Sequence, residues 1–349
     1  MEHFEDLDTA IERRRQMRIR RRRRLYVRRA LLLLACAAIL ALLIATPIWI
    51  VNGIRGHRDR MKDSQADTTP TVTQTTVPSE QKPAIPAVDA STAWLGSEVQ
   101  SEYAVLLDMT EGRVVAAKNP LAQANPASIT KVMTLLVAVE NIADLDDTFT
   151  MSYTIIDPVY KQEASVTGLL SGETVRLRDL LYGCILPSGA DAAIALATHV
   201  AGSEEAFAQL MNRRAAELGA TATHFTNASG LHGREHKTTA MDMALIMAAA
   251  MENEVCREVL MTRRYTSPST SYHPEGLLWE STLFGRIASD DHRILAGKTG
   301  YTDQAMNTLV TYTVGADKHE YVFVTMYVNG HEKAMQDAYY MYYDSLYCK

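Results

Sequence analysis

Hydrophobic and polar positions divide the 349-residue chain into three stretches. Residues 30–52 are almost wholly apolar and carry no charge, whereas residues 53–95 are rich in threonine and proline and poor in large apolar side chains. In residues 96–349, apolar positions recur with the spacing of strands and helices. The pattern therefore predicts a membrane segment, a disordered stalk and one domain large enough for a substantial core.

The apolar stretch is long enough to cross a membrane. Its 22 residues from Ala30 to Val51 would rise about 33 Å as a helix, and a hydrocarbon core is roughly 30 Å thick. A cleaved signal peptide is the competing interpretation, but its apolar region usually has only about 7–15 residues. We expect a transmembrane helix at residues 30–52 and a stalk at residues 53–95 that holds the domain away from the bilayer.

Charge is distributed unevenly along the chain and indicates an orientation in the membrane. Residues 1–29 contain eleven arginines and five acidic residues, so this arm carries +6, while the whole chain carries −6 and the remainder −12. A basic arm directly before an apolar span faces the cytoplasm and suits anionic lipids better than nucleic acid. We expect a single-pass cell-membrane protein with a cytoplasmic N-terminus and an extracytoplasmic domain.

Strand patterns occur at both ends of the domain, and helical patterns fill the middle. The strand patterns form two hairpins, at residues 103–108 with 113–117 and at residues 307–314 with 321–328. The helical patterns cover residues 128–142, 177–200 with a break near Pro187, 203–218 and 239–252. A closing helix has one apolar stripe made of Met335, Ala338, Tyr342 and Leu346. This order predicts an α+β fold, in which an antiparallel sheet is built from both chain ends and a helical subdomain is inserted between them.

Ser128 and Lys131 lie one helical turn apart at the start of the first long helix. A serine hydroxyl needs a nearby base to act as a nucleophile, and a lysine desolvated among apolar neighbours loses proton affinity and can supply that base. Backbone N–H groups at a helix start also favour a developing oxyanion. Taken alone, the pair is better explained as a helix cap followed by a solvated lysine, but the mostly apolar helix argues against a solvated lysine.

Two further strings contain groups suited to a catalytic cleft. Lys298-Thr299-Gly300 precedes the terminal hairpin, where the lysine and threonine can bind a carboxylate and the glycine lets a substrate backbone approach. Pro187-Ser188-Gly189-Ala190 lies in the break between two apolar helical segments, from which a loop serine can reach a cleft. For each string in isolation, an ordinary turn is the alternative.

In this order the three strings resemble the motifs of the penicillin-binding and serine β-lactamase superfamily. The closer resemblance is to the D-alanyl-D-alanine carboxypeptidases, the low-molecular-mass penicillin-binding proteins of peptidase family S11. It covers roughly residues 97–349 and rests on residues 126–134, 225–231, 238–244 and 297–302. The resemblance implies a β-lactamase/transpeptidase-like fold and no cofactor or metal.

The resemblance also implies roles for individual residues. Ser128 would attack the bond between two D-alanines of a peptidoglycan stem peptide and form an acyl-enzyme, with Lys131 as the base and Ser188 in the proton relay. The substrate-binding residues would be Lys298, Thr299, Gly300 and Tyr301. The backbone N–H groups of Ser128 and Tyr301 would form the oxyanion hole, and β-lactams would acylate the same serine and act as inhibitors.

The chain departs from the family pattern at two points. Ala190 stands where the second motif normally ends in asparagine, and Asp191 beside it is expected to point elsewhere. No arginine follows Arg293, so an arginine that binds the substrate carboxylate must come from earlier in the chain. A class A-like β-lactamase is one alternative, although no Glu-x-x-Leu-Asn-like string occurs between Ser188 and Lys298. A catalytically weak penicillin-binding scaffold is the other, because of Ala190.

Histidine and cysteine patterns do not indicate a metal site or a disulfide framework. His232 and His236 are four residues apart, but no third ligand follows at a suitable spacing, and a solvated loop is the better interpretation. The cysteines are scattered along the chain. Cys36 lies in the expected membrane span, and the remaining three, Cys184, Cys256 and Cys348, cannot pair completely.

Overall fold

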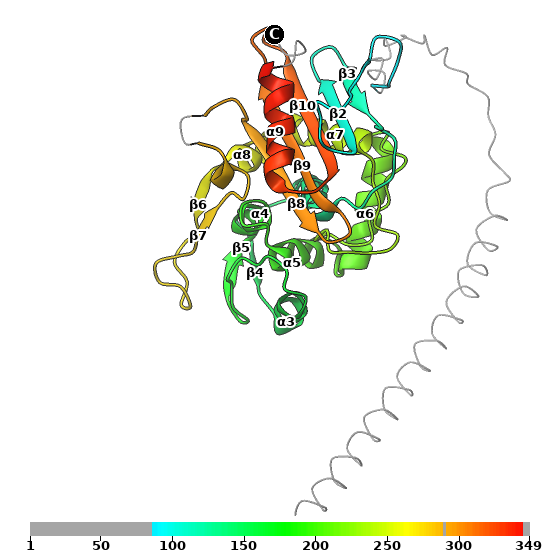
Figure 1. Ribbon diagram of the computed structural model, residues 1–349. Coiled ribbons are helices and arrows are strands. Elements are labelled where there is room, and N and C mark those ends of the chain that lie inside the picture. The colour runs from blue at the N-terminus through cyan, green and yellow to red at the C-terminus, as the bar shows by residue number, and fades with distance from the viewer. Residues whose placement is uncertain (1–85, 289–290, 345–349) are drawn as a thin grey trace, which may run out of the picture. The chain divides into compact units, whose positions relative to one another are not determined.

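A six-stranded sheet forms the centre of the structure, a computed structural model that describes residues 86–288 and 291–344 (Figure 1). In spatial order its strands are β1 (Ala93–Trp94), β3 (Arg113–Lys118), β2 (Tyr103–Asp108), β10 (Glu320–Val328), β9 (Met306–Val314) and β8 (Ala296–Thr302). All neighbours are antiparallel except β1, which is parallel to β3. Because β2 pairs with β10, the two predicted hairpins lie side by side, and the sheet is built from both ends of the domain.

Helices cover both faces of this sheet (Figure 1). Alternate residues of β10 divide between two cores: Val322 and Val324 pack with the inserted helices, while Tyr321 and Phe323 pack on the opposite face. On the first face lies α7 (Ala240–Glu252), which in turn packs against α2 (Thr130–Asn141). On the other face lies α9 (His331–Tyr339). The two-faced burial of β10 follows from the alternation of side chains along a strand.

The inserted block is mostly helical, which confirms the α+β prediction. Its helices and helical turns are η1 (Ala127–Ile129), α2, α3 (Tyr153–Lys161), α4 (Leu177–Ile185), α5 (Ala190–Ala201), α6 (Glu204–Glu217), α7, α8 (Glu254–Met261) and η2 (Phe284–Arg286). Two small hairpins accompany them, β4 (Thr148–Thr150) with β5 (Thr174–Arg176), and β6 (Arg264–Thr266) with β7 (Leu278–Glu280). A π-helical turn, η3 (Tyr340–Asp344), follows α9.

Local signals in the sequence place several helix boundaries correctly. The Ser203 side chain accepts a hydrogen bond from the Ala206 N–H at 3.1 Å and caps α6, as predicted. The expected break near Pro187 is confirmed, since α4 ends at Ile185 and α5 begins at Ala190. The predicted helix start at Ser128 is wrong in detail, because the 3₁₀ turn η1 precedes α2. The sequence also did not reveal α3 or the short strands, whose patterns span too few residues to show a period.

The N-terminal predictions fall largely outside the described residues. These are the basic arm at residues 1–29, the transmembrane helix at 30–52 and most of the stalk at 53–95. Strand β1 lies within the last of these ranges, so the sheet begins before residue 96. Within the described ranges, no helix has the length and apolar character needed to cross a membrane.

Candidate active site

The turn that carries Ser128 is held closely against strand β8. A Cβ atom added to Gly300 would lie 2.9 Å from the Ser128 backbone nitrogen and 2.4 Å from Thr308 Oγ1. Thr308 Oγ1 also donates to the Pro126 carbonyl oxygen at 2.9 Å, which joins the sheet to the chain just before the turn. Only glycine therefore permits the observed spacing at residue 300, and this spacing places the Ser128 N–H beside β8.

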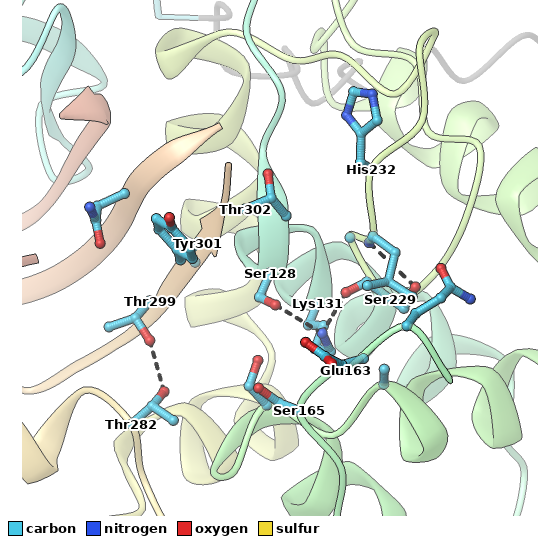
Figure 2. Close-up of a pocket in the computed structure, with 18 of the residues that line it drawn as sticks. Ser128, Lys131, Glu163, Ser165, Ser229, His232, Thr282, Thr299, Tyr301 and Thr302 are labelled. Atoms are coloured by element: carbon cyan, nitrogen blue, oxygen red, sulfur yellow. Dashed lines mark hydrogen bonds between the residues drawn. The ribbon is translucent and has the colours of Figure 1, made fainter. Parts of the chain in front are cut away.

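Lys131 lies one turn into α2, where its side chain is only 2% exposed. Its Nζ donates to Ser128 Oγ at 3.0 Å and to the Ser229 carbonyl oxygen (Figure 2). Burial is the main cause that lowers the pKa of Lys131 to about 8. At pH 7 about one tenth of this amine is therefore unprotonated.

Lys298 lies in β8 and is 1% exposed. Burial, followed by the positive charge of Lys131, lowers the pKa of Lys298 well below its ordinary value. The Lys298 amine donates to the Thr299 carbonyl oxygen at 2.8 Å. The Thr299 hydroxyl is 2.8 Å from the hydroxyl of Thr282, and Figure 2 shows this pair on the opposite side of Ser128 from Lys131.

Ser188 is the residue of the second string that reaches the same region. It is 5% exposed and has a positive φ of 63°. Its Oγ is buried and has no hydrogen-bond partner among the described residues. A buried, unpaired hydroxyl that lines a cleft is available to a ligand.

Ala190 and Asp191 follow at the start of α5. The Ala190 N–H donates to the Ser165 carbonyl oxygen at 2.8 Å, and Ala190 lines the cleft without the side-chain amide that the motif would supply at this position. The Asp191 carboxylate points away from the cleft and accepts from the Thr167 N–H at 3.0 Å and the Thr167 hydroxyl at 2.5 Å. The expectation that Asp191 points elsewhere is therefore confirmed, and its carboxylate does not replace the missing amide.

These residues surround one cleft of about 620 Å³. Of the seven residues predicted from the motifs, six line it: Ser128, Lys131, Ser188, Thr299, Gly300 and Tyr301. Lys298 is not among the lining residues and lies buried in the wall beneath them. The structure thus brings together strings that are separated by as many as 170 positions in the chain.

The cleft also contains residues that the motifs did not predict. Glu163 and Ser165 come from the loop after α3, and Arg286 comes from η2. Ser229 lines the cleft too, and its carbonyl oxygen accepts from the Lys131 amine. No sequence signal identifies Glu163, Ser165 or Arg286. Each lies on or directly after a helix or turn that is too short to show a periodic pattern of apolar residues. Ser229 lies within residues 225–231, which carried the resemblance, but its contact with Lys131 is visible only in three dimensions.

His236 is not in a solvated loop, so that prediction is wrong for this residue, which is 1% exposed. Its Nδ1 accepts from the Thr226 N–H at 3.0 Å, so its Nε2–H donates to Thr130 Oγ1 at 2.9 Å. Burial lowers the pKa of His236 to about 3. The neutral ring therefore links the loop that carries Ser229 to the start of α2. Among the described residues, no group of three or more His, Cys, Asp or Glu residues is arranged to hold a metal ion.

Comparison with known proteins identifies a single family. A family model described as D-alanyl-D-alanine carboxypeptidase matches residues 87–329. The chain is 38% identical to D-alanyl-D-alanine carboxypeptidase DacC of Escherichia coli over 252 residues, which cover 68% of this chain and 59% of that protein. It is 31% identical to DacD of the same organism over 63% of this chain and 57% of that protein. The chain therefore spans somewhat more than half the length of these curated relatives.

Solved structures agree in fold. The S216A mutant of the Streptomyces K15 DD-transpeptidase superposes with a TM-score of 0.65 at 27% identity, covering 69% of this chain and 95% of that one. A D-alanyl-D-alanine carboxypeptidase from Mycobacterium tuberculosis superposes with a TM-score of 0.61 at 30% identity, covering 69% of this chain and 88% of that one. The chain therefore shares the α+β fold of these two enzymes.

Proposed function

The chain belongs to the D-alanyl-D-alanine carboxypeptidase family, and we propose that it removes the terminal D-alanine from peptidoglycan peptides through an acyl-enzyme on Ser128. The observation that carries the proposal is the buried Lys131 amine, which lies 3.0 Å from Ser128 Oγ. A serine hydroxyl beside an amine with a pKa of about 8 is an activated nucleophile.

In the proposed acylation step, Ser128 Oγ attacks the carbonyl carbon between the two D-alanines as its proton passes to Lys131. The backbone N–H groups of Ser128 and Tyr301 stabilise the oxyanion. When the C–N bond breaks, the leaving amine receives the proton from Lys131 through Ser188, whose hydroxyl has no other partner among the described residues. In deacylation, water attacks the ester, Lys131 takes a proton from the water, and Ser128 Oγ regains one as the shortened peptide leaves.

The terminal carboxylate of the substrate would lie on the β8 side of Ser128. We propose that the Thr299 hydroxyl and the Arg286 guanidinium bind it, with Lys298 adding positive charge from beneath. Arg286 lines the cleft, and within residues 86–288 and 291–344 no ion pair or hydrogen bond engages its guanidinium group. Arg286 also agrees with the expectation that the arginine that binds the substrate carboxylate comes from earlier in the chain, since no arginine follows Arg293.

The alternatives differ from this proposal in the steps after acylation. A class A-like β-lactamase would hydrolyse β-lactams rapidly, and a weak scaffold would bind them without turnover of peptides. Ala190 is the feature that favours the scaffold, because the family amide helps to position the lysine. In this chain the Ser229 carbonyl oxygen accepts from the Lys131 amine, and this contact supports an active enzyme.

The full chain, incubated with a fluorescent penicillin, is expected to become covalently labelled, while Ser128→Ala remains unlabelled. Release of D-alanine from a pentapeptide, compared with hydrolysis of nitrocefin, then separates a carboxypeptidase from a β-lactamase. Labelling without D-alanine release and without nitrocefin hydrolysis would establish the scaffold, and the absence of labelling would overturn the proposal.

We propose further that residues 30–52 anchor the enzyme in the cell membrane, with the arm at residues 1–29 in the cytoplasm and the catalytic domain outside. The apolar run and the eleven arginines before it support this topology. A protease is added to cells whose wall and any outer membrane have been removed but whose cytoplasmic membrane is intact. The protease is expected to degrade the domain. Protection of the domain would contradict the orientation.

A further inference from the structure

The end of helix α3 places a charged side chain where glycine is usual. The Ala164 N–H donates to the Val159 carbonyl oxygen at 3.0 Å, and the Glu163 N–H donates to the Tyr160 carbonyl oxygen at 3.1 Å. These two bonds define a Schellman motif, in which Glu163 occupies the left-handed position with a φ of 51°. Glutamate is strained in this conformation, which glycine adopts freely.

Helix α6 provides a comparison within the same chain. Its end has the same two bonds, from the Ala220 N–H to the Ala215 carbonyl oxygen and from the Gly219 N–H to the Ala216 carbonyl oxygen. The left-handed residue there is Gly219, with a φ of 81°. Folding alone therefore favours glycine at this position, and the glutamate at the end of α3 indicates a role for its side chain.

The Glu163 side chain lies at the catalytic cleft and is available to a ligand. The residue is exposed and lines the same cleft as Ser128 and Lys131. Within the described ranges, no hydrogen bond or ion pair holds its carboxylate. The other acidic residue that lines the cleft, Asp303, accepts a hydrogen bond from the Tyr301 hydroxyl at 3.0 Å. Glu163 is therefore the acidic group of the described cleft that remains free to bind a cation.

The position of Glu163 relative to Ser128 indicates which part of a substrate it meets. Figure 2 shows Thr282 and Thr299 on one side of Ser128, and Glu163 on the other side with Lys131. If the terminal carboxylate binds at Thr299, the peptide on the acyl side of the scissile bond extends past Ser128 towards Glu163. A carboxylate in this position attracts an ammonium group of the substrate peptide and disfavours a peptide that carries an additional acidic group there.

We propose that Glu163 is a specificity-determining residue that binds an ammonium group carried by the acyl portion of the substrate peptide. This inference rests on the proposed function of the cleft. Its ligand is the cationic side chain of a diamino acid immediately before the D-alanines. A contact of this kind between exposed charges corresponds to about a fivefold preference over a neutral side chain.

The test uses two peptides that differ in one charge, Nα-acetyl-L-Lys-D-Ala-D-Ala and the same peptide with its side-chain amine acetylated. For the full-length wild type, kcat/KM for D-alanine release is expected to be about fivefold higher on the free amine. Glu163→Gln is expected to reduce this ratio to about 1, and added salt to reduce it in the wild type. Glu275→Gln, which removes an exposed carboxylate that does not line the cleft, keeps the wild-type ratio.

Glu163→Gly separates recognition from folding. Glycine relieves the left-handed conformation, so this variant is expected to lose the charge preference while its melting temperature rises by about 2–4 °C. A wild-type ratio of 1, or equal losses on both peptides in Glu163→Gln, would overturn the inference and leave the proposed function standing. Equal losses would instead make Glu163 a general base or a support for the loop. A full chain that neither binds penicillin nor releases D-alanine would overturn both proposals together.

Discussion

The strongest consequence of the structure concerns the proton affinity of Lys131. Lowering its pKa from 10.5 to about 8 corresponds to a penalty of about 3 kcal/mol for keeping the charged form in the folded protein. About one tenth of the amine is unprotonated at pH 7, and about half at pH 8. The rate of Ser128 acylation by a β-lactam is therefore expected to rise nearly tenfold from pH 6 to pH 7 and to level off above about pH 8.

Replacing Lys131 with methionine removes the amine and keeps a long side chain in the apolar environment. Loss of a general base is expected to lower the acylation rate by about 10²–10⁴-fold, measured as the second-order rate of labelling by a fluorescent penicillin. Lys118→Met is a matched control, since that lysine is outside the cleft and donates to the Val99 carbonyl oxygen.

The same substitution tests the folded-state pKa through stability. Because the folded protein binds this proton less tightly than the unfolded chain, the penalty is present in full below about pH 8 and disappears between about pH 8 and 10.5. Loss of the hydrogen bonds to Ser128 and Ser229 offsets about 2 kcal/mol, so Lys131→Met is expected to be about 1 kcal/mol more stable at pH 7. Urea unfolding at several pH values measures this difference. Acylation within tenfold of the wild type, or a difference in stability that does not change between pH 8 and 10.5, would refute the reasoning.

Three further predictions concern the supports of the site. Gly300→Ala is expected to push β8 away from the Ser128 N–H and reduce penicillin acylation by about 10²-fold, whereas Gly285→Ala, whose Cβ would meet no atom within 4 Å, should acylate normally; equal effects would contradict the steric argument. Ala190→Asn restores the family amide and is expected to raise kcat/KM for D-alanine release by less than about tenfold, since the base is already held; a gain above about 10²-fold would show that the present base is poorly positioned. His236 has its pKa lowered to about 3, so the unfolded chain binds the additional proton first, and the free energy of unfolding should fall by about 1.4 kcal/mol per pH unit from about pH 6.5 towards pH 3. His236→Gln, compared with the wild type by urea unfolding, should reduce that slope, and an unchanged slope would assign the acid sensitivity to other groups.

Much of the fold was accessible from the sequence because the signals involved are local. Alternating apolar residues identified the hairpins that became β2–β3 and β9–β10, and a serine before an amphipathic run identified the start of α6. These patterns reflect backbone geometry within a few residues, so no knowledge of distant contacts is needed. Short elements such as α3 and β4–β5 have too few residues for such a period, and they form because the surrounding structure covers them.

The sequence by itself determined the family, the three motif strings and the order of strands and helices. Only the tertiary structure decided which side chains meet. It placed the Ser229 carbonyl oxygen against the Lys131 amine, turned Asp191 towards Thr167, and brought Glu163 and Arg286 into the cleft with Ser128. The physical reason is that burial and contact depend on residues far apart in the chain. A lysine becomes a base only when the fold removes water from around it, and no string of four residues contains that information.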